Sequence, residues 1–113
     1  MGARYRVTVR RRGKTEKGTH ASLDEALGAL EGRLRELTAE LRPRTERGLG
    51  RDYEPQRQVA LRGELRGPRG LAAGVDVRGD GSAEAFTGRV VRRLVEAEGR
   101  EDAYAALRRV AAG

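Results

Sequence analysis

The chain has 113 residues and a mass of 12.4 kDa, which is enough for one domain over residues 1–113 and too little for two. It has no cysteine and one histidine, which excludes a disulfide framework, a thiolate metal site and a cysteine nucleophile, and leaves little material for a histidine-based metal site. The formal net charge of +7 favours polyanionic partners such as nucleic acids.

The basic character has a second explanation in the composition. Of the 24 basic residues, 22 are arginine, and isoleucine and asparagine are absent. This usage is typical of a GC-rich genome, so part of the arginine excess can reflect codon bias. The charge therefore shows what the surface attracts, and it does not by itself identify a ligand.

The first predicted element is a strand over residues 4–12. Tyr5, Val7 and Val9 alternate with polar and basic residues, which is the period of a half-buried strand. A polar loop is predicted over residues 13–21, because this segment is hydrophilic and has glycine at two positions.

A long helix is predicted to begin after Ser22. Ser22 and Glu25 have the spacing of a capping box, and leucines follow in alternating steps of four and three residues. Pro43 ends the helix, because the residue before a proline disfavours helical geometry. The leucine stripe comprises Leu23, Leu27, Leu30, Leu34, Leu37 and Leu41.

Three strands are predicted in the second half of the chain, after a polar loop over residues 43–55. A strand over 56–66 is separated by a turn at 67–70 from a strand over 71–78. Asp80-Gly81 then indicates a tight hairpin, because glycine supplies the positive φ of such a turn. The last strand begins at Ser82 and is interpreted as a long one that ends near Val95, while residues 89–97 also fit a helical face. The inward residues of the 56–66 strand are Val59, Leu61, Gly63 and Leu65.

A final helix is predicted over residues 100–112, because acidic residues in its first turn and arginines in its last complement the helix dipole. The element order is therefore β-α-β-β-β-α. It predicts an α+β fold, a two-layer sandwich of a mixed, mostly antiparallel four-stranded sheet with two helices on one face and water on the other. This order resembles the ribosome-hibernation-factor fold, and its last four elements resemble the end of a double-stranded-RNA-binding domain. The resemblance is one of topology, so it implies no site residues.

The sequence contains no motif that supports catalysis, so we predict a non-enzymatic protein without a metal or cofactor. Gly13-Lys14-Thr15 lacks the glycine five residues upstream that a phosphate-binding loop requires. A calcium loop over residues 76–87 would place Arg78 at a ligand position. The carboxylates around Gly99 are interpreted as solvated, and an enzyme would need them to line a concave pocket.

The strongest functional signal is a set of basic residues that share the predicted outer face of the sheet. Such a face can hold the phosphate backbone of RNA or DNA, with little sequence specificity because Tyr5 and Phe86 are expected to point inward. In the alternative interpretation the face is solvated, and its arginines pair across strands with Glu64, Asp76 and Glu84. The candidate nucleic-acid-binding residues are Arg4, Arg6, Arg10, Arg12, Lys14, Lys17, Arg62, Arg66 and Arg78.

A second hypothesis rests on the leucine stripe, whose spacing is also that of a coiled-coil seam over fewer than three heptads. Packing on the chain's own sheet is the simpler explanation, but an uncovered part of the stripe would drive homodimerisation. The candidate interface residues are Leu30, Leu34, Leu37 and Leu41.

The start of the chain lacks the apolar core of a signal peptide, and no stretch is long and apolar enough to span a bilayer. A cytoplasmic protein without a membrane partner is therefore expected. Together these observations predict a small basic binding protein that is nucleic-acid or ribosome-associated. The alternative is a protein-interaction or homodimerising module.

Overall fold

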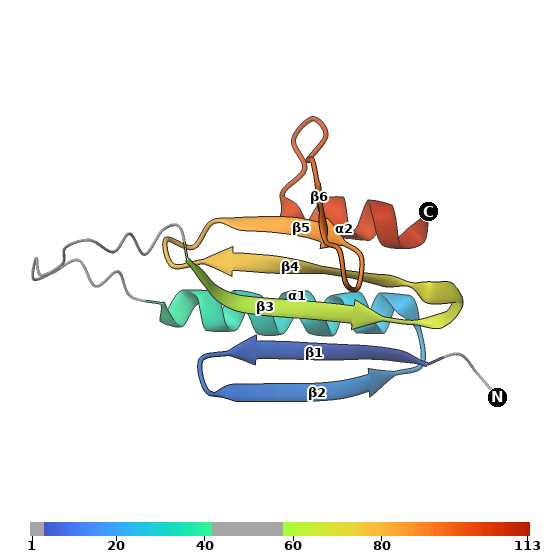
Figure 1. Cartoon of the computed structure of the whole chain (residues 1–113), viewed down its shortest axis with the longest axis horizontal. Helices are drawn as coiled ribbons and strands as arrows, with labels where there is room; N and C mark the ends of the chain where they lie inside the picture. Colours follow the sequence, from blue (N-terminus) through green and yellow to red (C-terminus); the bar gives the residue numbers. More distant parts are fainter. Residues whose placement is uncertain (1–3, 42–57) are drawn as a thin grey trace, which may run out of the picture.

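The structure is a computed structural model that describes residues 4–41 and 58–113. These residues form a six-stranded antiparallel sheet in the order β2-β1-β3-β4-β5-β6, with two α-helices (Figure 1). The α+β class is as predicted, but the sheet has six strands in place of four and is not mixed. The strands are β1 (Tyr5–Arg11), β2 (Lys14–His20), β3 (Val59–Arg66), β4 (Ala72–Arg78), β5 (Ala83–Thr87) and β6 (Arg93–Val95). The helices are α1 (Leu23–Glu40), a short 3₁₀-helix at Pro68–Gly70 and α2 (Ala103–Ala112).

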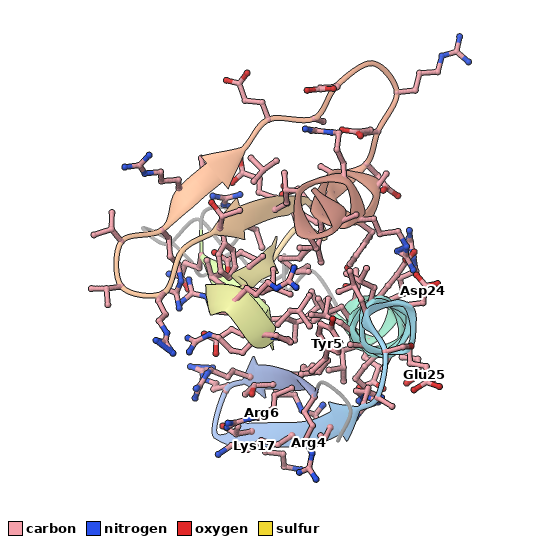
Figure 2. The ribbon with its side chains drawn as sticks, turned by 90° about the vertical axis from the view of Figure 1, so that its right-hand side faces the viewer. Arg4, Tyr5, Arg6, Lys17, Asp24 and Glu25 are labelled. Atoms are coloured by element: carbon pink, nitrogen blue, oxygen red, sulfur yellow. The ribbon has the colours of Figure 1, made fainter. Side chains whose placement is uncertain are left out.

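The core lies between the helices and one face of the sheet. Figure 2 shows both helices on the same side of the sheet. The alternation predicted for the first strand is confirmed, because Val7 and Val9 are buried in this core together with inward residues of β3, β4 and β5. The helices contribute Ala26, Leu27, Leu30, Leu34, Leu37, Tyr104, Ala106 and Leu107.

Helix α1 begins where the sequence predicts. The Ser22 hydroxyl oxygen accepts a hydrogen bond from the Glu25 backbone N–H at 3.1 Å, which satisfies one free donor of the first turn. The helix ends at Glu40, and the Leu41 N–H donates to the Thr38 carbonyl oxygen at 3.0 Å. The predicted loop over 43–55, with Pro43, lies outside the described residues.

The polar segment after the first strand is a strand and not a loop. Gly13 adopts a φ of 72° in the turn after β1, and β2 then pairs with β1 along seven positions. Because glycine tolerates this positive φ, the chain can reverse in a two-residue connection. The prediction failed because β2 has no apolar face: its helix-side positions are Glu16, Gly18 and His20.

The predicted long strand from Ser82 to Val95 is two strands. Gly88 has a φ of 105°, the chain turns over residues 88–92, and β6 runs back antiparallel to β5. Residues 89–97 are therefore neither a helix nor a continuation of β5. The observed order is β-β-α-β-β-β-β-α, so the element order that carried the resemblance to the hibernation-factor fold is absent.

Three carboxylates on the helix side should make the fold sensitive to acid. Hydrogen bonds from Arg33 to Glu16, at 2.7 and 2.8 Å, and from Arg109 to Glu101, at 2.9 and 3.0 Å, lower the pKa of each glutamate below its ordinary 4.5. The Ala105 N–H, which donates to the N-cap carboxylate of Asp102 at 2.8 Å, lowers the pKa of Asp102 below 3.8.

A lowered folded-state pKa stabilises the fold above the unfolded-state pKa, and this contribution is lost as the pH falls through the folded value. We therefore expect the free energy of unfolding to be flat from about pH 8 to about pH 5 and to fall below about pH 4.5. Urea unfolding across this range measures it. A Glu101→Gln variant should show a shallower acid loss, and an equal loss in both proteins would contradict the assignment.

Candidate nucleic-acid interface

The outer face of the sheet, opposite the helices, carries rows of residues that the strand register aligns. Each row crosses the sheet from β2 towards β5, so its members are direct neighbours. The first row is Thr19, Arg6, Arg66 and Ala72; the second is Lys17, Thr8, Glu64, Gly74 and Phe86; the third is Thr15, Arg10, Arg62, Asp76 and Glu84.

The third row carries its own counter-charges. Asp76 accepts from the Arg62 guanidinium, with Nη2 at 3.1 Å from Oδ2, and this hydrogen bond raises the pKa of Arg62. Beside this row, Arg78 Nη1 donates to Glu84 Oε1 at 2.6 Å. The alternative predicted from the sequence, that arginines pair across strands with these two carboxylates, is confirmed here.

The second row has a carboxylate at its centre. Glu64 is only 8% exposed and contacts two guanidinium groups, Arg10 Nε at 3.4 Å and Arg92 Nη2 at 2.9 Å. A carboxylate buried to this extent needs such partners, because desolvation disfavours its charged form. Arg10 is therefore partly neutralised within the protein.

Phe86 lies on the outer face and not, as predicted, on the inward one. It pairs in register with Gly74, is 2% exposed, and is not part of the core cluster beneath the helices. The turn over residues 88–92 crosses in front of the sheet (Figure 1). The Arg92 guanidinium carbon lies 5.0 Å from the centre of the ring, within range of a cation–π contact. The outer face is therefore not wholly open to water.

The first row differs from the other two. Arg6 and Arg66 face each other as direct partners on β1 and β3, and their row neighbours are the uncharged Thr19 and Ala72. Among the residues that the structure describes, neither arginine forms an ion pair. Two like charges placed opposite each other destabilise a sheet. Of the two facing arginine pairs on β1 and β3, this pair is therefore the less compensated one.

Two more cations extend this pair. Arg4 directly precedes β1 and Lys17 lies diagonally from Arg6 on β2, both exposed and without an ion pair within the described ranges. Figure 2 shows Arg4, Arg6 and Lys17 gathered beside β1 and β2, while Asp24 and Glu25 lie on the other side of the sheet, at the start of α1. We call Arg4, Arg6, Lys17 and Arg66 the basic patch.

The other predicted binding residues lie elsewhere. Arg12 is exposed in the turn between β1 and β2, at the opposite end of β1 from the patch. Lys14 is the register partner of Arg11, which places it among the helix-side positions of β2. The nine predicted residues therefore do not form one continuous stripe.

The leucines proposed for a dimer seam lie inside the molecule. Leu30 and Leu34 are fully buried, Leu37 is nearly so, and Leu41 is partly buried against the same core. A seam formed by these side chains would require the core to open. The leucine stripe has its partner within its own chain.

Three of the carboxylates around Gly99 are held in ion pairs or in a helix cap. Glu98 and Glu101 both pair with Arg109, at 3.2 and 2.9 Å, and Asp102 caps α2. In the described part of the chain, no three histidine, cysteine or acidic side chains group as metal ligands would. No helix in residues 4–41 and 58–113 is long and apolar enough to cross a membrane.

The described residues thus define a small basic α+β protein with a six-stranded antiparallel sheet and, on its outer face, an arginine pair that has no carboxylate partner among them. Comparison with protein-family models, with curated proteins and with solved structures gave no match.

Proposed function

We propose that this protein binds the phosphate backbone of RNA or DNA through the basic patch. The observation that carries the proposal is the facing pair Arg6 and Arg66. Within residues 4–41 and 58–113 this pair has no carboxylate partner, whereas the neighbouring pair, Arg10 and Arg62, contacts two carboxylates. A phosphate group between Arg6 and Arg66 would supply the missing negative charge. Guanidinium groups bind phosphate oxygens in a bidentate manner, which makes such contacts strong.

The patch supports recognition of the backbone and not of the bases. Tyr5 is on the helix side of β1, partly buried against the core, and Phe86 is covered. No aromatic ring within the described residues is thus exposed next to the patch for stacking on a base. The proposed binding is therefore electrostatic and weakly dependent on sequence.

A salt series of fluorescence anisotropy with labelled single- and double-stranded RNA and DNA tests the proposal. Each phosphate that a cation neutralises releases counterions, so the logarithm of the binding constant should fall linearly with the logarithm of the salt concentration. Four cations predict a slope of about −3 to −4 for a duplex. Absence of binding at low salt would remove the proposal.

Charge reversal at Arg6 locates the interface. In an Arg6→Glu variant the new carboxylate faces Arg66 and pairs with it, so two phosphate contacts are lost together. We expect affinity to fall by about tenfold or more and the salt slope to decrease by about two.

The matched control is Arg100→Glu, which changes the net charge equally at an exposed position of the turn before α2. This variant should lose no more than about threefold in affinity, because its charge acts only at long range and is screened. Equal losses in the two variants would mean that net charge, and not the patch, governs binding.

A further inference from the structure

A second feature of the outer face lies at the end of β1 remote from the basic patch. There the protein has an open hollow of about 280 Å³ between the end of β1 and the start of β3. Four arginines line it, and its remaining surface comes from the first residues of β3. The lining arginines are Arg10, Arg11, Arg12 and Arg62. We call this feature the arginine hollow.

Two of these arginines lack strong partners. Arg11 is not one of them, because it lies on the helix side of β1 and its terminal nitrogens are 3.8 Å from Glu40 and 4.0 Å from Glu16. Among the described residues Arg10 meets a carboxylate only through its Nε, 3.4 Å from Glu64 Oε1, and its side chain is 52% exposed. Arg12 forms no ion pair in the described part of the chain. Arg10 and Arg12 are both exposed, and a guanidinium group carries more donors than these contacts use, so the hollow favours an anion that offers several oxygens.

The hollow also has an apolar surface. The register between β3 and β4 shifts between Val59 and Leu61, and Val59 is 43% exposed although the alternation predicts it to point inward. This irregularity in the strand brings a valine side chain to the surface beside the guanidinium groups. A ligand that fits both parts therefore combines a strongly negative group with an apolar one.

We propose that the arginine hollow binds a nucleoside phosphate monoester, either the terminal phosphate of a nucleic-acid strand or a free mononucleotide. A monoester carries a charge of about −1.5 to −2 at neutral pH and offers three acceptor oxygens, whereas an internal diester phosphate carries a single charge. Arg10 and Arg12 hold the phosphate, and the base or sugar packs on Val59. The choice of a nucleoside rests on the proposed function, whereas the preference for a dianion rests on the hollow alone.

The test compares oligonucleotides of one sequence with a 5′-phosphate, a 3′-phosphate or hydroxyls at both ends. We expect one phosphorylated form to bind at least about fivefold more tightly than the hydroxyl form. An Arg12→Ala variant should lose this preference and keep its affinity for the hydroxyl form, whereas Lys14→Ala, an equal charge change two residues away, should keep both. A preference that survives Arg12→Ala overturns the assignment to the hollow.

Titration with adenosine 5′-monophosphate and with inorganic phosphate separates the two sources and the two proposals. A mononucleotide site predicts shifts of the backbone amide signals of Arg12 and Ala60 with the nucleotide. These shifts should exceed those with inorganic phosphate and vanish in Arg12→Ala. This result would support the site even if no oligonucleotide binds and the proposed function fails. Equal shifts with both anions overturn the nucleoside part. Equal binding of all three oligonucleotides, with no shift by the nucleotide, overturns the hollow and leaves the proposed function intact.

Discussion

Replacing Leu34 with alanine is expected to lower the free energy of unfolding by about 2–5 kcal/mol. Leu34 is fully buried in α1 and packs closely over β3: a Cβ added at Gly63 would lie 2.7 Å from Leu34 Cδ1. Removal of the side chain loses apolar burial and leaves a cavity, since glycine on the facing strand has no side chain to fill it. Urea unfolding followed by circular dichroism measures the loss.

Leu94→Ala is the matched control, because Leu94 is 65% exposed on β6 and its replacement should change the free energy of unfolding by no more than about 0.5 kcal/mol.

The Leu34→Ala and Leu94→Ala variants also distinguish the two explanations of the leucine stripe, which are core packing and a seam between two copies. If the stripe were a seam between copies, the unfolding midpoint of the native protein would rise with its concentration. In that case the Leu34→Ala variant would have a lower particle mass by light scattering, and the free energy of unfolding of its monomer would be unchanged.

Elements with a strong apolar period could be predicted from the sequence. β1 alternates cleanly and α1 has its leucines on one stripe, because in both elements a single face is buried and the sequence pattern follows it. The helix start was equally readable from Ser22 and Glu25, whose spacing places a hydroxyl at a free N–H.

Two strands could not be predicted, for opposite reasons. β2 lies at the edge of the sheet and presents Glu16 to Arg33 in place of an apolar residue, so its burial pattern leaves no hydrophobic period. Residues 89–95 are rich in valine, which favours a strand, but the β-propensity of a residue does not indicate where the chain reverses its direction. The positive φ of Gly88 supplies that reversal, and a glycine within a strand-like run indicates only a break of unspecified geometry.

The candidate site was partly predictable. Alternation places Arg6 and Arg10 on one face of β1 whatever the partner strand. Whether each arginine meets a carboxylate depends on the register between strands far apart in sequence, which pairs Arg6 with Arg66 and leaves Glu64 near Arg10. A shift of one residue would exchange the faces, so the uncompensated pair is a property of the fold and not of the local sequence.

Phe86 lies on the outer face, although an aromatic ring is expected in the main core. In β5 it shares its face with Glu84, and it is buried only because Gly74 leaves space on β4 and Arg92 covers the ring. The outer face thus has a small apolar centre of its own, which holds the turn over 88–92 against the sheet. The absence of a side chain at Gly74 is the condition for this packing.

Gly74→Ala should therefore destabilise the protein by about 1–3 kcal/mol, although the change adds one methyl group. The new Cβ would lie 2.6 Å from Phe86 Cζ and would clash with the Gly63 backbone oxygen, so a strand or the ring must move. Urea unfolding measures the loss. If the ring moves, the signals of Arg92 and Phe86 in the NMR spectrum shift as well.

Gly32→Ala is the control for the glycine-to-alanine change itself. Gly32 is exposed within α1 and a Cβ there meets nothing within 4 Å, so alanine should stabilise the helix by about 0.5–1 kcal/mol. Opposite signs for the two variants are the expected result. A neutral Gly74→Ala would mean that Phe86 does not rest on β4, and the turn over 88–92 would then lose its anchor on the outer face.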